Sequence, residues 1–332
     1  MSPRQSTPLD RRDFLKSAAA GLIVLPHPDL RALGARLLRQ GTTVALVRTD
    51  DRKAGVARLM KLLNPKGMAG KAVNLKPNFN TADPAPAGTH NDTLAQIVTE
   101  LKERDARTVV VGESSFPPTQ NVLEAKGILD LANDMEFGIV NYDEIPDNEW
   151  IHFTPAGTHW PEGFHLPRHV VESEYMVSTC CLKTHGSGGV FTMSMKLSVG
   201  LTPKSIRRTM HRSPDMRRMI AELNQGYRPD LIVMDGVQAF TDGGPSRGRL
   251  AQANVMIAGT DRVAVDAVGL AVLKDLGSND AVMGTPIFQQ EQMARAVEVG
   301  LGVRGPAEIA LISDDEAGTA YAATLRTILA QG

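Results

Sequence analysis

Short apolar runs that alternate with segments of helical periodicity constrain the fold of this chain more than any other feature. An uninterrupted apolar run is typical of a strand that a sheet buries on both faces. Strands that alternate with helices in this way form parallel sheets with right-handed crossovers. The apolar runs occupy residues 43–47, 71–75, 108–111, 138–142, 175–182, 230–234 and 255–258. We therefore predict an α/β fold: a mostly parallel open sheet with helices on both faces, built from β-α-β units.

The segments between these runs set the expected helices and the expected division of the chain. The spacing of apolar residues predicts one helix over residues 121–131. A stretch rich in proline, glycine and histidine, residues 146–172, breaks the alternation, and we expect an irregular insertion there, a hairpin or a lid. Its histidines match no standard spacing of metal ligands. A first β-α-β half, residues 40–145, and a second α/β half, residues 173–332, are expected to share one core.

The first forty residues resemble a bacterial twin-arginine export signal. Arg11 and Arg12 precede an apolar run, residues 18–25, which Pro26 breaks, and a small-residue cleavage site follows at residues 32–34. The alternative is a chance basic patch before a buried helix. The run is shorter than the ~20 residues that cross a bilayer, so no stable membrane anchor is expected. The resemblance implies a signal over residues 1–34, the twin-arginine translocation machinery as a partner, and a periplasmic or extracytoplasmic location reached in the folded state.

Charge and cysteine usage exclude several classes of function. The net charge is −1 and aromatic residues make up only 5% of the chain, with no basic stripe, so we expect no nucleic-acid partner. The two cysteines, Cys180 and Cys181, are adjacent and have no C-x-x-C spacing. We therefore expect no iron–sulfur cluster from this chain's own cysteines, and the sequence identifies no other cofactor or metal.

Polar clusters at the ends of four predicted strands point to a binding site. They begin at Lys76, Glu113, Lys183 and Asp235, and the strand over residues 230–234 is expected to end at Asp235. In an open parallel sheet, ligands bind beyond the carboxyl ends of the strands. We therefore predict a cleft there that these four strand ends share.

The lysines among apolar residues suggest that the ligand is an anion. Lys183 and Lys196 are costly in such surroundings unless each ammonium group meets an anion or its pKa falls. They are interpreted as an anion clamp, or as an amine activated by desolvation. The alternative is snorkelling, or a structural ion pair with Glu113 or Asp235. Lys76 allows the same functional interpretation, or that of a plain surface lysine.

Three further features accompany these lysines. His185 could act as an acid, a base or a ligand. The glycine-rich segment 241–248 could wrap an anion with its backbone N–H groups, or could be a plain turn. Asp266 lies in an apolar helix and needs a partner there, either a lysine of the clamp or a backbone N–H.

In order along the chain, these motifs resemble the family called domain of unknown function 362. The resemblance rests on Lys76-Pro77-Asn78, Lys183-Thr184-His185 with Lys196 downstream, Asp235-Gly236 with the glycine-rich segment behind it, and residues 258–267. It spans about residues 43–303. Arg262 stands where the family usually has proline, and the cysteine-rich segments with which many members bind four-iron clusters are not found in this sequence.

Our leading hypothesis is an exported, soluble enzyme that acts on a small anionic substrate, a carboxylate or a phosphate; its reaction class is open. The candidate catalytic residues are Lys183, His185, Glu113 and Asp235. The candidate ligand-binding residues are Lys76, Asn78, Ser114, Lys196, Gly243, Gly244 and Ser246. One alternative is a redox or cofactor-associated protein that partners an iron–sulfur protein, and another is a non-catalytic protein that binds an anion.

Overall fold

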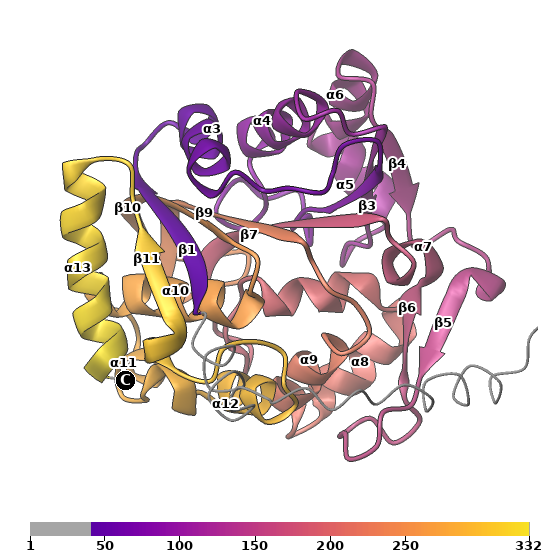
Figure 1. Cartoon of the computed structure of the whole chain (residues 1–332). Coiled ribbons are helices and arrows are strands. Elements are labelled where there is room, and N and C mark those ends of the chain that lie inside the picture. The colour runs from indigo at the N-terminus through magenta and orange to yellow at the C-terminus, as the bar shows by residue number, and fades with distance from the viewer. Residues whose placement is uncertain (1–40, 332) are drawn as a thin grey trace, which may run out of the picture. The chain divides into compact units, whose positions relative to one another are not determined.

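A nine-stranded sheet forms the centre of the chain in a computed structural model that describes residues 41–331 (Figure 1). The predicted export signal, residues 1–34, lies outside the described residues. Eight strands follow the order β11-β1-β10-β9-β7-β2-β3-β4, and β8 pairs with β7. The strands are β1 (Thr42–Arg48), β2 (Ala72–Lys76), β3 (Thr108–Glu113), β4 (Gly138–Asn141), β7 (Tyr175–His185), β8 (Val190–Phe191), β9 (Leu231–Gly243), β10 (Gly248–Gly259) and β11 (Ile309–Ile312).

Most neighbouring strands of the sheet run parallel. Strands β10 and β8 are the exceptions: β10 lies antiparallel to both β1 and β9, and β8 lies antiparallel to β7. Strands β7, β2, β3 and β4 form a parallel series. Strand β1 lies between β10 and β11, so the first strand of the chain sits among strands from its last third. The predicted fold class, a mostly parallel α/β sheet, is confirmed.

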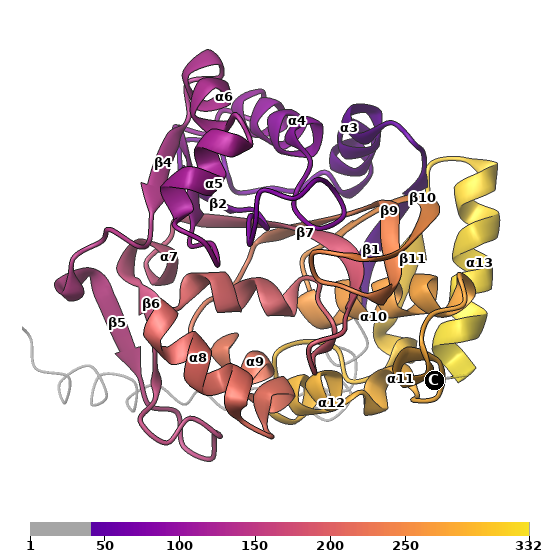
Figure 2. The ribbon, with the colours of Figure 1, turned by 180° about the vertical axis from the view of Figure 1, so that it is seen from behind.

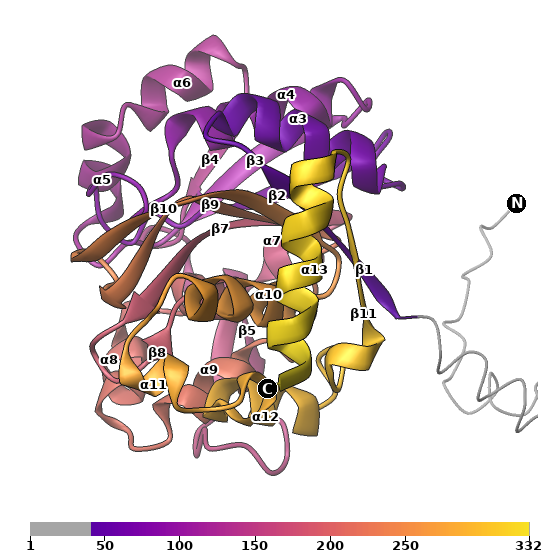
Figure 3. The ribbon, with the colours of Figure 1, turned by 90° about the vertical axis from the view of Figure 1, so that its left-hand side faces the viewer.

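Helices cover both faces of the sheet (Figures 1 and 2). One face packs against α3 (Arg52–Leu63), α4 (Asn91–Lys102), α5 (Thr119–Ala125) and α6 (Ile128–Asp134). The other face packs against α8 (Lys204–Arg212), α9 (Met216–Leu223), α10 (Arg262–Asp275), α12 (Glu291–Glu298) and α13 (Glu316–Gln331). Figure 3 shows α13 running beside α10. Among residues 41–331, no helix is both long and apolar enough to cross a membrane.

Local sequence signals explain where the main helices begin and end. The Asp261 side chain accepts hydrogen bonds from the backbone N–H groups of Val263 and Ala264, and so caps α10. Asp51 caps α3 in the same way, and α3 ends at Asn64, which adopts the left-handed conformation. The prediction of one helix over residues 121–131 was wrong. Gly127, with φ of +67°, divides that segment into α5 and α6.

The prediction that a strand ends at Asp235 was also wrong, because β9 continues through an irregular register to Gly243. The Asp235 carboxylate accepts a hydrogen bond from Arg52 within the protein, so this polar residue does not end the strand. The glycine-rich segment forms the turn of the β9–β10 hairpin. This turn packs on the end of β7, where a Cβ atom on Gly244 would collide with the carbonyl oxygen of Thr184.

Residues 146–172 contain a small second sheet. Strands β5 (Trp150–Phe153) and β6 (Phe164–Pro167) pair antiparallel, flanked by the 3-10 helix η1 (Asp147–Glu149) and the short helix α7 (Arg168–Val171). The Nε1–H group of Trp160 donates to the carbonyl oxygen of Met219 at 3.1 Å, which fixes the connecting loop to α9. The remaining short elements are η2 (Met195–Leu201), α11 (Asp280–Met283), η3 (Ile287–Gln289) and η4 (Pro306–Glu308).

Candidate functional site

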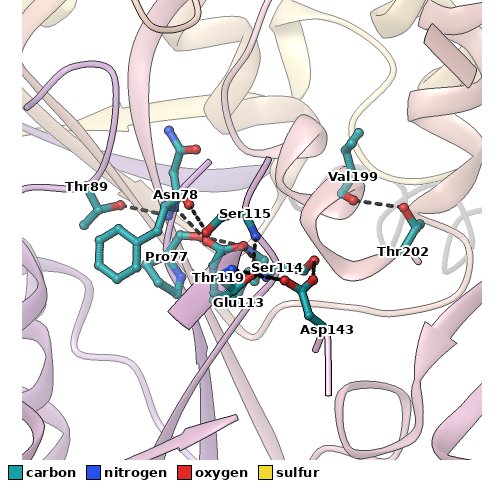
Figure 4. A network of polar contacts seen from close by, with 12 residues as sticks. Pro77, Asn78, Thr89, Glu113, Ser114, Ser115, Thr119, Asp143, Val199 and Thr202 are labelled. Carbon is teal, nitrogen blue, oxygen red and sulfur yellow. Dashed lines mark hydrogen bonds and ion pairs between the residues drawn. The ribbon is translucent and has the colours of Figure 1, made fainter. Parts of the chain in front are cut away.

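Lys76 and Glu113 form a buried ion pair at the carboxyl ends of two neighbouring parallel strands, β2 and β3. Lys76 Nζ lies 2.6 Å from Glu113 Oε1 and donates to the carbonyl oxygen of Pro77, and each side chain is only 2% exposed. Glu113 also accepts from the backbone N–H groups of Ser114 and Phe79, one on each carboxylate oxygen (Figure 4). Burial lowers the pKa of Lys76, and the Glu113 carboxylate opposes that effect. The pair is thus saturated by contacts within the chain.

A second polar network lies directly beside this pair. Ser114 Oγ donates to Asp143 Oδ1 at 2.6 Å, and Thr119 Oγ1 donates to Asp143 Oδ2 at 2.7 Å (Figure 4). Lys204 Nζ lies 2.7 Å from the same Oδ2 atom. Partial burial raises the pKa of Asp143, but the hydrogen bonds from Lys204, Ser114 and Thr119 outweigh it and lower the pKa. The Ser114 hydroxyl therefore has an internal partner.

The loop after β2, residues 77–90, connects this region to the end of β7. The backbone N–H of Asn78 donates to Thr89 Oγ1 at 2.9 Å (Figure 4). The Asn78 side-chain amide donates to the carbonyl oxygen of Ala87 at 3.4 Å, and Lys183 Nζ donates to the same oxygen. Asn78 thus lies next to Lys183, as the sequence predicts for neighbouring strand ends.

Lys183 is a buried ammonium group without a carboxylate partner. Its side chain lies in β7 and is 1% exposed, and within residues 41–331 its only hydrogen bond goes to the Ala87 carbonyl. Burial lowers the pKa of Lys183 to about 8, and the nearby charge of Lys126 acts in the same direction. Its hydrogen-bond partner is a neutral carbonyl, and the nearby Asp83 carboxylate, which opposes the lowering of the pKa, forms no ion pair with it.

Lys196 is the second such group, and it lies on η2. It is half-buried and forms no hydrogen bond or ion pair with any part of the chain that the structure describes. Burial lowers the pKa of Lys196 to about 7, and the positive charges of Lys183 and Arg207 contribute. Both of these positive charges disfavour the charged form of Lys196.

Asp266 holds the start of the element that carries Lys196. Its carboxylate accepts from the backbone N–H groups of Ser194 at 2.8 Å and of Met195 at 3.0 Å. The sequence left two possible partners for Asp266, a lysine of the clamp or a backbone N–H. The structure shows backbone N–H groups as its partners. Complete burial raises the pKa of Asp266 to about 7.

His185 is a neutral donor beside the lysines. Its side chain is 4% exposed, and its Nδ1 atom accepts from the backbone N–H of Gly189 at 3.3 Å. Burial, and then the charge of Lys196, lower the pKa of His185 to about 2. Because Nδ1 is the acceptor, we assign the proton to Nε2, which has no hydrogen-bond partner within residues 41–331.

Asp235 lies on the α3 and α4 face of the sheet and has other partners. Its Oδ2 atom is 2.8 Å from Arg52 Nε and accepts from Thr93 Oγ1 at 2.8 Å. From the sequence, Glu113 and Asp235 are the candidate ion-pair partners of the lysines Lys183 and Lys196. Glu113 pairs with Lys76, whereas Asp235 pairs with Arg52.

The backbone N–H groups of Gly243 and Gly244 in the glycine-rich turn donate to acceptors within the turn itself. The N–H of Gly243 donates to Asp242 Oδ1 at 2.8 Å, and the N–H of Gly244 donates to the carbonyl oxygen of Arg247 at 2.6 Å. Neither N–H is therefore directed at a ligand. Ser246 lies in the same turn and is half-buried.

Two cations of this neighbourhood were not predicted. Arg207, on α8, donates to the carbonyl oxygens of Ser114 and Thr202 at 2.9 Å each, and it forms no ion pair with a carboxylate in the described chain. Burial lowers the pKa of Arg207 to about 10. Lys126 lies at the end of α5, with its Nζ atom 5.2 Å from the ring centre of Phe79. The sequence signal for Arg207 was the basic run at residues 204–212, K-S-I-R-R-T-M-H-R.

The arrangement is therefore rich in cations and donors. Four of its side chains form no ion pair with a carboxylate among residues 41–331, while Lys76 forms one with Glu113; the four are Lys126, Lys183, Lys196 and Arg207. Within those residues, no group of three or more His, Cys, Asp or Glu side chains is placed to hold a metal ion. Cys180 and Cys181 are buried, free thiols at successive positions of β7, so they point to opposite faces and do not fit a shared cluster.

A pocket of about 750 Å³ opens at the other edge of the sheet, where β1 begins and β10 ends. We place the candidate site at the lysines instead, because Lys183 is buried there and forms no ion pair within residues 41–331. The lining residues of the pocket are Thr42, Asn224, Gln225, Gly226, Tyr227, Arg228, Thr260, Asp261, Arg262, Val299, Gly300, Leu301 and Gly302.

Fold and site together define an α/β protein with a buried cationic cluster at the carboxyl edge of its sheet. The sequence matches the family described as domain of unknown function 362 over residues 73–271, and the chain belongs to that family. Arg262, the departure from the family pattern, is buried and donates to Asn224 Oδ1 at 2.7 Å.

The proteins that are similar to this chain include a thylakoid-associated protein and one solved structure. A thylakoid-associated protein of Synechocystis sp. is 24% identical over 247 residues, which cover 70% of this chain and 74% of that protein. The lactate racemase apoprotein from Thermoanaerobacterium thermosaccharolyticum superimposes with a TM-score of 0.45 at 16% identity. That match covers 71% of this chain and 56% of the racemase chain.

Proposed function

We propose that this chain is an enzyme that binds a small anion, a carboxylate or a phosphate, among Lys183, Lys196 and Arg207. One observation carries the proposal: Lys183 is buried beside a second lysine, and its only hydrogen bond in residues 41–331 goes to a neutral carbonyl. An unpaired buried charge is costly, and an anionic ligand would remove that cost.

The neighbouring groups have separate roles in this proposal. Lys183 and Arg207 hold the negative charge, and the Nε2–H group of His185 donates a hydrogen bond to it. Lys196 is the proton carrier, because its pKa of about 7 lets it exchange a proton near neutral pH. Glu113 and Asp235, which the sequence suggested as proton-transfer groups, position the surrounding chain through Lys76 and Arg52.

Anion binding is tested by thermal unfolding in acetate and in phosphate, at constant ionic strength. We expect at least one of the two anions to raise the melting temperature of the wild type. Lys183→Met and Lys196→Met should each remove that rise, and Lys66→Met, an exposed lysine on another part of the surface, should keep it. If neither anion stabilises the wild type, the proposal is wrong.

The dependence of anion affinity on pH provides a second test of the proposed site. Bound anion favours the charged form of each lysine, so binding should take up protons. Affinity should therefore fall as pH rises through about 7 to 8, the range of the two lysine pKa values. An affinity that stays constant across this range would exclude these lysines as the binding groups.

Catalysis is distinguished from binding alone by the fate of the ligand. Native mass spectrometry of purified protein identifies a retained anion, and incubation with that anion in excess shows whether it is converted. A ligand that stabilises the wild type and is never converted would favour the non-catalytic binding protein. Lys196→Met should abolish conversion if Lys196 carries the proton.

We also propose that the protein is exported in the folded state by the twin-arginine translocation machinery. The support is the order of Arg11, Arg12 and the apolar run 18–25. The double substitution Arg11→Lys/Arg12→Lys should keep the protein in the cytoplasm of a bacterial host, whereas Arg31→Lys/Arg36→Lys should not. Cell fractionation checks both, and equal export of the two variants would contradict the proposal.

A further inference from the structure

A stripe of positive charge runs along the exposed side of α8. Lys204, Arg208 and Arg212 stand at positions i, i+4 and i+8 of this helix, so they lie on one side of it, and all three are exposed. The opposite side is apolar: Met210 is buried, and Ile206 packs against the same core cluster. Helix α8 thus runs along the surface of the molecule with its basic side toward solvent (Figure 2).

Carboxylates compensate only part of this stripe. Lys204 pairs with Asp143, whose Oδ2 atom lies 2.7 Å from Lys204 Nζ. Arg208 and Arg212 form no ion pair and no side-chain hydrogen bond within residues 41–331. Like charges at i and i+4 destabilise a helix. An anionic surface that meets the two arginines would therefore stabilise α8.

Phe116 protrudes beside the first turn of α8. It is 82% exposed, the most of any large apolar residue among residues 41–331. Two contacts from α8 flank it. Lys204 Nζ donates to the carbonyl oxygen of Pro117 at 2.9 Å, and Arg207, on the inner side of the helix, donates to that of Ser114 at 2.9 Å. The basic stripe and the apolar ring are therefore neighbours on one surface.

The loop that carries Phe116 is held in place on its other side as well. The backbone N–H of Phe116 donates to the carbonyl oxygen of Asn80 at 2.8 Å, and Ser115 Oγ donates to that of Phe79 at 2.5 Å. Two prolines, at positions 117 and 118, follow and restrict the backbone further. The ring is thus presented to water by a fixed loop, and its transfer into an apolar layer would be favourable.

We propose that the basic side of α8 and Phe116 together bind the surface of a membrane that contains anionic lipids. Such a surface supplies headgroup phosphates for the cations and, ~5–10 Å beneath them, an apolar layer for the ring. An acidic protein would meet the cations, but its charged groups would leave the ring in water. The attachment is peripheral and reversible, and it does not rest on the proposed function.

Co-sedimentation of the full chain with vesicles at low ionic strength tests this proposal. Vesicles of phosphatidylcholine alone are compared with vesicles that also contain phosphatidylglycerol. We expect at least tenfold tighter binding to the anionic vesicles, and added salt should weaken it. A lysine or arginine near an anionic bilayer contributes about fivefold in affinity, so Arg208→Gln/Arg212→Gln should weaken this binding at least tenfold. Phe116→Ser should weaken it at least threefold.

The matched control is Lys61→Gln/Lys66→Gln, which removes two exposed charges at α3 and the turn after it, on the other face of the sheet. It should weaken binding less than twofold. All substituted side chains are exposed, so each variant should keep the melting temperature of the wild type. Every variant retains residues 1–40, so differences in binding report on the substituted positions.

Two results would overturn the proposal. One is equal binding, or none, to the two kinds of vesicle. The other is an arginine variant that binds as well as the lysine control. Polyglutamate tests an acidic protein as the partner. If it binds the wild type as tightly as the anionic vesicles do, and Phe116→Ser changes neither affinity, the partner is an acidic protein and the membrane is refuted.

Discussion

Two buried lysines on adjacent parallel strands, Lys76 on β2 and Lys183 on β7, have opposite surroundings. Lys76 meets the Glu113 carboxylate at 2.6 Å, while Lys183 meets only a backbone carbonyl. Both are almost fully buried, so burial does not distinguish them. The counterion does: the Glu113 carboxylate compensates part of the cost of burying Lys76, whereas Lys183 forms no such ion pair within residues 41–331.

The largest expected effect on stability comes from removing one partner of the Lys76–Glu113 ion pair. Lys76→Met should lower the free energy of unfolding by about 3–5 kcal/mol, because it leaves the Glu113 charge buried without its partner. Urea denaturation measures the loss. The double variant Lys76→Met/Glu113→Gln should recover part of it by removing that charge. A loss below about 1 kcal/mol for the single variant would mean that the two lysines do not differ in this way.

For Lys183, which lacks an ion pair in the described chain, we expect a change in the free energy of unfolding of the opposite sign. Without ligand at pH 7, Lys183→Met should raise the free energy of unfolding by about 1–3 kcal/mol, because it removes an uncompensated buried charge. The folded pKa of about 8 lies below the ordinary value of 10.5, so the penalty is complete below pH 8. It disappears as pH rises toward 10.5, and denaturation at pH 7 and at pH 10.5 should show the gap closing. If Lys183→Met instead lowers the free energy of unfolding at pH 7, Lys183 has a structural role and does not await a ligand.

The smallest effect concerns the carboxylate nearest to the start of η2. Burial raises the pKa of Asp266 from 3.8 to about 7, so the protonated side chain favours folding. That contribution is complete below pH 3.8 and is lost as pH rises through about 7. Relative to the wild type, Asp266→Asn should thus gain about 1 kcal/mol per pH unit between pH 5 and pH 6. If Asp266 were instead the counterion of Lys196, its ionised form would be favoured and the trend would reverse.

The sequence predicted the sheet and the edge at which the lysines lie, because both depend on local patterns. Apolar runs mark the strands, and a lysine directly after such a run must lie near the end of a strand. The pairing of each lysine could not be predicted. It depends on the strand order β7-β2-β3, which places Glu113 beside Lys76 and not beside Lys183.

Contacts between distant elements account for the other differences. Asp235 reads as the end of a strand, yet Arg52 of α3 and Thr93 of α4 satisfy its carboxylate, so β9 continues past it. Arg207 lies in a basic run of α8, and its guanidinium meets the carbonyl oxygen of Ser114, the residue after β3, only in the folded chain. Such contacts join residues 93 to 183 positions apart in the chain, beyond the reach of any local pattern.

Because β1 pairs with β10 on one side and β11 on the other, it gains its neighbouring strands only after the segments that follow it have been synthesised. At translation rates of about 5–20 residues per second, the wait is on the order of tens of seconds. During that time Val44, Ala45, Leu46 and Val47, all inaccessible to solvent in the finished fold, have no sheet to cover them. A nascent chain of this topology therefore carries an unpaired apolar strand until β10 and β11 are synthesised.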